Sequence, residues 1–189
     1  MAHKQVTGDG EEPARRDVLF LATGAMGAVG LGAAVWPLID QMNPSASERA
    51  LSSIDVDVSE IEVGQQITVT FLKSPVFIRR LTPEEMEAAN ATPMSDLKDQ
   101  SAQNPKNPDS EATLADRLVD PERDYLVMSG VCTHLGCVPV GEAGDFGGWF
   151  CPCHGSHYDT AGRIRKGPAP TNMAIPEYTF LNDTRIKIG

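Results

Sequence analysis

Cysteine and histidine are concentrated in one short window of this chain, between Val131 and Asp159. The window holds all four cysteines and three of the four histidines among 189 residues. Thiolates and imidazoles are the ligands of zinc and iron–sulfur sites, and paired cysteines also form disulfides. The sequence therefore predicts a metal centre, a disulfide, or both, and the rest of the fold has to position this window.

Two short Cys/His pairs lie in the window, Cys132-x-His134 and Cys151-x-x-His154. Sixteen residues separate the two pairs, so each can lie on its own loop and two loops can hold one centre from opposite sides. A four-ligand zinc site is an alternative. Zinc sites usually have roughly two to four residues between their first two ligands, and zinc leaves Cys137 and Cys153 without a role.

The overall composition limits the classes of function. A formal charge of −10 excludes nucleic-acid binding, because no basic patch is available to neutralise phosphates. A hydrophobic content of 41% is ordinary for a globular protein, and the length fits one domain with appendages.

An uncharged, mainly apolar stretch of 22 residues runs from Val18 to Ile39. As a helix it would be about 33 Å long, enough to cross a hydrocarbon core of about 30 Å. The apolar part of a cleaved signal peptide is shorter, typically ~7–15 residues. We therefore expect a transmembrane anchor at 18–39 that is retained in the lipid bilayer.

Basic residues predict the orientation of this anchor. Lys4, Arg15 and Arg16 precede the span, whereas only Arg49 lies in the stretch that follows it. The positive-inside rule then makes residues 1–17 a cytoplasmic tail and puts the cysteine window on the other side. The Arg15-Arg16 pair ahead of an apolar run also resembles a twin-arginine export signal, a route for proteins folded around a cofactor.

After the anchor we expect a flexible linker at 40–50 and a small antiparallel β head at 51–189. The linker is polar and has no apolar period. Thr82 and Glu85 form a capping-box pattern for a helix that begins at Pro83. The polar stretch 90–121 is expected to be a surface excursion with at most a short helix. Alternating or continuous apolar runs predict strands at 54–58, 66–71, 76–80, 125–128, 178–181 and 184–188.

The segments Cys132–Cys137 and Cys151–Ser156 resemble the two motifs of the Rieske iron–sulfur protein of cytochrome bc complexes. The apolar span, the linker and the β head also fit this family, and the resemblance is weakest over 90–121. It implies a mainly β head with an inserted cluster-binding subdomain at about 130–172 and one [2Fe–2S] cluster. It further implies that one iron binds Cys132 and Cys151, that the other binds His134 and His154, and that Cys137 and Cys153 form a disulfide.

Such a ligand set has chemical consequences. Two thiolates and two neutral imidazoles leave an oxidised [2Fe–2S] core neutral, whereas four thiolates leave it a dianion. A neutral centre accepts an electron more readily, so its potential is roughly −150 to +300 mV, against about −400 mV for all-cysteine clusters. Imidazole also exchanges protons near neutral pH. The resemblance therefore implies electron transfer coupled to proton transfer at His134 and His154.

The resemblance also assigns roles around the cluster. It implies that Ser156 and Tyr158 donate hydroxyl hydrogen bonds to sulfur atoms of the site, which stabilises the reduced state. It implies that Leu135 and Gly136 form an exposed tip that docks on partner proteins. The stretch Gly167–Pro170, with Pro168 on the docking surface, resembles the rigid proline loop of the family.

In function, the chain is identified as a member of the electron-transfer subunits of quinol–cytochrome c oxidoreductase, an enzyme complex. The implied partners are quinol, a cytochrome b subunit and a c-type cytochrome subunit in a dimeric complex. The implied location is the bacterial inner membrane, with the head in the periplasm, where a disulfide is stable. The alternatives are a Rieske subunit of another exported oxidoreductase, such as an arsenite oxidase, and a zinc-stabilised exported binding domain.

Overall fold

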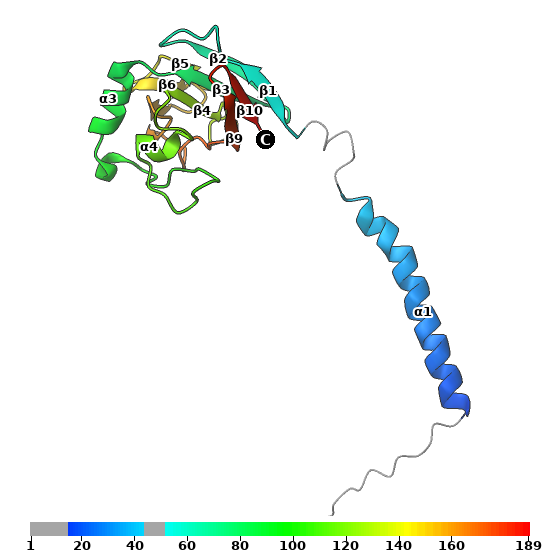
Figure 1. Cartoon of the computed structure of the whole chain (residues 1–189). Coiled ribbons are helices and arrows are strands. Elements are labelled where there is room, and N and C mark those ends of the chain that lie inside the picture. The colour runs from blue at the N-terminus through cyan, green and yellow to red at the C-terminus, as the bar shows by residue number, and fades with distance from the viewer. Residues whose placement is uncertain (1–14, 44–51) are drawn as a thin grey trace, which may run out of the picture. The chain divides into compact units, whose positions relative to one another are not determined.

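The computed structural model describes residues 15–43 and 52–189 (Figure 1). The chain divides into two compact units, Met1–Arg49 and Ala50–Gly189. Most of the expected N-terminal tail at 1–17 and of the expected linker at 40–50 lies outside the described residues. The anchor helix and the head are therefore described separately.

The N-terminal unit contains the helix α1, Arg15–Asp40, which includes the whole apolar stretch expected from the sequence. Its 26 residues extend about 39 Å. None of its residues is buried, and large apolar side chains such as Phe20 and Trp36 are about 70% exposed. Within the described part of the chain, it is the one helix long and apolar enough to cross a membrane.

The head is built from antiparallel strands in three sheets. The first sheet has the order β2 (Gln66–Phe71), β3 (Ser74–Arg80) and β4 (Tyr125–Ser129). The second has the order β1 (Ile54–Asp57), β10 (Arg185–Ile188) and β9 (Tyr178–Asn182). The third has the order β5 (Val140–Gly141), β6 (Gly147–Cys151), β7 (Ser156–Asp159) and β8 (Ile164–Lys166). The expectation of a mainly antiparallel β fold is confirmed.

The third sheet lies between β4 and β9 in the sequence and carries the cysteine window. The other two sheets contain the six strands expected from the sequence. The hairpin between β2 and β3 closes with only Leu72 and Lys73, because Phe71 pairs with Ser74. Both turn residues have positive φ, 48° and 65°, the backbone of the tight turns that match strand twist.

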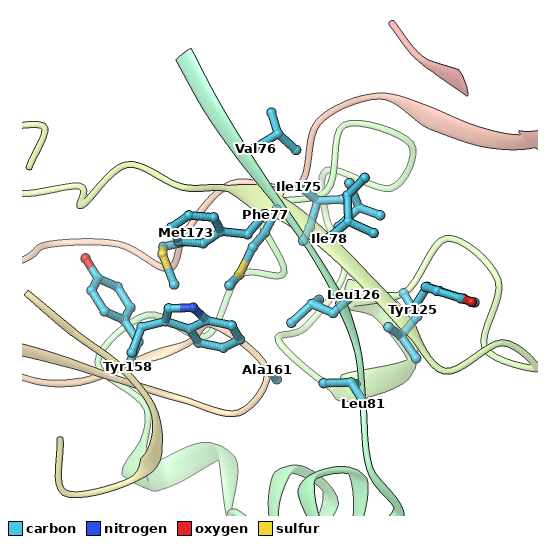
Figure 2. Close-up of a cluster of buried hydrophobic side chains, with 14 of the residues drawn as sticks. Val76, Phe77, Ile78, Leu81, Tyr125, Leu126, Tyr158, Ala161, Met173 and Ile175 are labelled. Atoms are coloured by element: carbon cyan, nitrogen blue, oxygen red, sulfur yellow. The ribbon is translucent and has the colours of Figure 1, made fainter. Parts of the chain in front are cut away.

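The hydrophobic core joins the first sheet to the third (Figure 2). In each of β3 and β4, four consecutive residues are buried, Val76–Arg79 and Tyr125–Met128, as expected for short, mainly apolar runs. Figure 2 shows Tyr125 and Tyr158 at opposite ends of the labelled side chains, with the Tyr158 hydroxyl pointing away from them. The Tyr158 ring is therefore anchored in the core while its hydroxyl faces the cysteine window.

The helix α3, Pro83–Ala91, begins with the predicted capping box. The Glu85 amide donates to Thr82 Oγ1 at 3.2 Å, and the Thr82 amide donates to the Glu85 carboxylate at 2.9 Å. The same carboxylate accepts a hydrogen bond from Arg79 Nη2 of β3 at 2.6 Å. One glutamate thus caps the helix and holds it against the first sheet.

The expectation of a surface excursion at 90–121 is wrong in part. This stretch has two short helical turns, η1 (Met94–Asp96) and α4 (Leu114–Arg117), and an isolated bridge between Ser101 and Glu111. Several of its side chains are buried, namely Leu97, Ala102, Ala112, Leu114, Arg117 and Leu118. Sequence reading missed this because the buried residues are small or scattered and follow no regular period.

Candidate metal centre

The two cysteine loops, Cys132–Cys137 and Cys151–Ser156, contain the same backbone turn. In the first, the Gly136 amide donates to the Cys132 carbonyl at 3.0 Å. In the second, the Gly155 amide donates to the Cys151 carbonyl, also at 3.0 Å. Both glycines have positive φ, 81° and 75°, which glycine adopts without steric cost. In each loop, the turn brings the histidine back towards the cysteine that starts it.

The two histidines, one from each loop, meet at the edge of this site. The ring centroids of His134 and His154 are 4.6 Å apart, and the rings are nearly perpendicular. His154 is exposed, whereas His134 is half-buried and its Nδ1 atom is buried without a hydrogen-bond partner. A buried nitrogen with no partner is rare in a folded protein and is expected where it binds a metal.

The four cysteines divide into two pairs. Cys137 and Cys153 form a disulfide that joins the two loops, as the resemblance implied. Cys132 and Cys151 are free thiols, each 2% exposed. The sulfur atoms of Cys137, Cys151 and Cys153 lie within 4.8 Å of one another. Because the disulfide uses two of these sulfurs, Cys132 and Cys151 are the thiols left for a metal.

Tyr158 contacts the first of these thiols. Its hydroxyl donates to Cys132 Sγ at 3.3 Å and accepts a hydrogen bond from the Thr133 amide, also at 3.3 Å. Burial and the bond to Cys132 raise the pKa of the Tyr158 hydroxyl far above its usual range. Tyr158 therefore stays protonated and donates to sulfur at any physiological pH.

The environments of the two free thiols differ. Burial raises the pKa of Cys132, but hydrogen bonds from Tyr158 and the His134 backbone outweigh it, so its pKa is lowered. Burial raises the pKa of Cys151, and the neighbouring Cys132 raises it further. Metals bind the thiolate, so the hydrogen bonds that stabilise the Cys132 thiolate also favour metal binding at this position.

Ser156 connects the site to the proline loop, Gly167–Pro170. Its side chain is 1% exposed, and its Oγ accepts a hydrogen bond from the Ala169 amide at 3.2 Å. The Ser156 side chain is also one of the groups that lower the pKa of the Cys132 thiol. Thr133 Oγ1 donates to the carbonyl of Thr171, just beyond the proline loop, at 2.7 Å. The proline loop is thus tied to both cysteine loops.

The exposed surface around the histidines is apolar. Leu135 is 71% exposed at the tip of the first loop, and Gly136 and Pro168 are exposed as well. Further along the first loop, Val138 is 53% exposed. Exposed apolar side chains gathered in this way are typical of a surface that binds a partner.

The donor set fits a [2Fe–2S] cluster with mixed ligands. Two buried thiols outside the disulfide and two imidazoles, one with an unpartnered buried nitrogen, supply two sulfur and two nitrogen ligands. Such a set is characteristic of Rieske centres, in which two histidines replace two cysteines on one iron.

Comparison with known proteins gives the same answer. Residues 54–179 match the family "Rieske [2Fe-2S] domain". Residues 6–45 match a second family, "Ubiquitinol-cytochrome C reductase Fe-S subunit TAT signal". The chain belongs to the Rieske iron–sulfur subunits of ubiquinol–cytochrome c reductase. This Rieske chain therefore carries one [2Fe–2S] cluster. Its export-signal match includes the apolar helix α1, which is consistent with a membrane-anchored subunit.

Several relatives are similar along nearly their whole length. The ubiquinol–cytochrome c reductase iron–sulfur subunit of Cereibacter sphaeroides is 57% identical over 93% of this chain and 95% of its own. That of Rhodobacter capsulatus is 56% identical over the same shares. That of Rhodospirillum rubrum is 51% identical over 95% of this chain and 94% of its own.

The structure brings several of the expected site residues of this Rieske subunit into contact, namely His134 with His154, Cys137 with Cys153, and Tyr158 with Cys132. It adds Thr133, which lies between two expected ligand positions and bonds to both Tyr158 and the Thr171 carbonyl. No sequence signal distinguishes this threonine, because its role depends on a loop 38 residues away. His157, outside the expected ligand set, lies between Phe146 and Phe150 and accepts a hydrogen bond from the Asp145 amide.

Proposed function

We propose that this subunit accepts one electron, together with a proton, from a quinol bound by cytochrome b and passes the electron to a c-type haem subunit. The observation that carries the proposal is the pair of histidine rings at the exposed edge of a site whose free thiols are buried. When bound, the [2Fe–2S] cluster supplies a centre that gains and loses a single electron.

The ligands are assigned from their surroundings. Cys132 and Cys151 would hold one iron, because they are the free buried thiols. His134 and His154 would hold the other, because their rings contact each other and the Nδ1 atom of His134 is otherwise unpartnered. Tyr158 donates to Cys132 Sγ, and we assign the same donor role to Ser156, whose side chain lowers the pKa of that thiol. Both hydroxyls would favour the more negative, reduced state of the site.

The exposed histidine is suited to a proton-transfer role. His154 is exposed, so an imidazole nitrogen that does not bind iron would be able to accept a hydrogen bond from a quinol hydroxyl. It then holds the proton of that hydroxyl as the quinol is oxidised. A partner surface that covers Leu135 and Pro168 excludes water from this contact.

The proposed topology places the head outside the cytoplasm. Arg15 and Arg16 begin the helix α1, and its last turn contains no basic residue. By the positive-inside rule, the N-terminus stays in the cytoplasm and the head lies in the periplasm. An oxidising compartment is also where the Cys137–Cys153 disulfide persists. We place the subunit beside cytochrome b and a c-type cytochrome in a dimeric complex of the bacterial inner membrane.

Electron paramagnetic resonance of reduced membranes tests this proposal. We expect a [2Fe–2S] signal with a mean g value well below 2, and co-purification of the chain with a b-type cytochrome. We also expect inhibitors of quinol oxidation to stop cytochrome c reduction. A colourless chain that contains zinc, or a chain that purifies with a different oxidoreductase, would contradict it.

Replacing Tyr158 with phenylalanine removes the hydroxyl donated to the Cys132 sulfur. We expect the midpoint potential to fall by roughly 60 mV, because a hydrogen bond to a charged group contributes about 1.5 kcal/mol and 59 mV corresponds to about 1.4 kcal/mol for one electron. Ser156→Ala should lower the potential in the same direction. Redox titration followed by electron paramagnetic resonance measures both shifts.

Tyr178→Phe is the matched control for this prediction. Tyr178 is also a buried tyrosine, 2% exposed, but its hydroxyl accepts a hydrogen bond from the Val119 amide and contacts no cysteine. Its loss should leave the midpoint potential unchanged. Equal shifts in the Tyr158 and Tyr178 variants would show that the effect is not a hydrogen bond to sulfur.

A further inference from the structure

The proline loop, Gly167–Pro170, is held on its outer side by the excursion at 90–121. Lys98 Nζ donates to the Gly167 carbonyl at 2.6 Å and to the Ala169 carbonyl at 3.1 Å. The next residue, Asp99, accepts a hydrogen bond from the Asn172 amide at 2.8 Å. Two adjacent side chains of the excursion therefore bind the proline loop and the residue two positions beyond it.

On its inner side the proline loop contacts the second cysteine loop. A Cβ atom added to Gly167 would overlap the backbone of Gly155 and Ser156, so the two backbones are in direct contact there. Ala169 is fully buried, and its amide donates to Ser156 Oγ at 3.2 Å. The Ala169 residue is thus fixed twice, by Lys98 at its carbonyl and by Ser156 at its amide.

The Ala169 amide determines what the Ser156 hydroxyl can do. A serine hydroxyl has one hydrogen and two lone pairs. Because one lone pair accepts the Ala169 amide, the hydroxyl hydrogen points away from that amide and is available to sulfur. If the proline loop moved outward, Ser156 would lose this restraint and could rotate its hydrogen away from the site.

We propose that Lys98 is a positioning residue for electron transfer, which holds the proline loop so that Ser156 stays oriented as a donor to the cluster sulfur. This inference rests on the proposed function, because it takes Cys132 and Ser156 as part of the cluster site. Pro168 and Pro170 each fix their own φ angle, which stiffens the proline loop. The two hydrogen bonds from Lys98 to the loop carbonyls therefore hold the loop in position. The excursion then acts on the midpoint potential without contacting the cluster ligands.

The proposal predicts that Lys98→Met lowers the midpoint potential of the full-length, cluster-loaded chain by no more than Ser156→Ala does. Lys98→Arg, which keeps the charge and the donors, should restore most of the lost potential. Lys106→Met is the matched control, because Lys106 lies in the same excursion and its Nζ donates to the Tyr178 carbonyl at 2.7 Å. That variant should leave the potential unchanged.

A double-mutant cycle separates the positioning role from a simple effect of charge. If Lys98 acts through Ser156, Lys98→Met should produce no further shift in a Ser156→Ala background. Additive shifts would overturn the proposal, because they would mean that the ammonium charge acts on the cluster directly. An unchanged potential in Lys98→Met, with a shift in Ser156→Ala, would overturn the proposal and leave the proposed function intact. No shift in either variant would overturn the tuning role of Ser156 as well.

Hydrogen exchange gives a second readout that does not depend on activity. The proline loop contains only two amide hydrogens, those of Gly167 and Ala169, because prolines have none. In Lys98→Met we expect faster exchange in the peptide that covers this loop, and no change in Lys106→Met. Unchanged exchange in Lys98→Met would show that the ammonium does not hold the loop, and would overturn the proposal.

Discussion

Arg117→Met is expected to lower the free energy of unfolding of the head by about 3–5 kcal/mol, as for other buried charged groups whose partners are left behind. The Arg117 side chain is fully buried. Its guanidinium donates to backbone carbonyls from three separate segments, namely Ala102 at 2.6 Å, Ala161 at 2.6 Å and Met173 at 2.8 Å. Methionine has a similar length but no donor, so all three buried carbonyls would lose their partner.

Arg117 remains charged at neutral pH. Burial lowers the pKa of Arg117 to about 10, partly offset by the negative charge of Asp159. Because this folded-state pKa still lies well above 7, the guanidinium is protonated under physiological conditions and donates to all its carbonyl partners. Its charge-assisted bonds connect the excursion at 90–121 to the segments that flank the proline loop.

Guanidinium denaturation of the full-length chain in detergent measures this loss. Arg123→Met is the matched control, since Arg123 is part-exposed and pairs with Asp120 and with Asp183, itself 94% exposed. Exposed ion pairs contribute about 0–1 kcal/mol, so this control should unfold close to the wild-type midpoint. Similar midpoints for the Arg117 and Arg123 variants would contradict a structural role for the buried arginine.

The second large effect is expected from the Cys137→Ser, Cys153→Ser double variant. The disulfide joins residues 16 positions apart in the sequence, and closing a loop of this size stabilises a chain by roughly 3 kcal/mol. Because the bond also ties together the two loops that carry the histidines, we expect the variant to retain little cluster. Iron content per chain and the denaturation midpoint measure the two consequences.

A polar change at a neighbouring exposed position controls for the serines themselves. Val138 follows Cys137 directly and is 53% exposed, so Val138→Ser should preserve both cluster content and stability. If the double variant instead kept wild-type iron content, the two loops would hold the cluster without the disulfide. Its role would then be limited to stability.

Much of the fold could be predicted from the sequence because its signals are local. The strands of the first and second sheets alternate or run continuously in apolar residues, and the capping box of Thr82 and Glu85 is complete within four positions. The ligand spacing is also local, since each cysteine loop closes within five residues. These features need no knowledge of the rest of the chain.

The contacts between the excursion and the site could not be predicted in this way. Lys98 binds carbonyls about 70 positions away, and Arg117 binds carbonyls 15 to 56 positions away. Every residue has a backbone carbonyl, so the sequence does not indicate which carbonyl a side chain such as Lys98 or Arg117 will bind. The polar composition of residues 90–121 therefore indicated a surface loop, although it contains a fully buried arginine.

The pairing of β1 with β10 has a consequence for the order in which the head folds. Ile54 in the first strand of the head pairs with Ile188 in its last strand. Contacts between residues this far apart in the sequence form slowly, because a long stretch of chain must be ordered before they are made. We therefore expect the second sheet, whose central strand is β10, to form after the local hairpins of the first and third sheets.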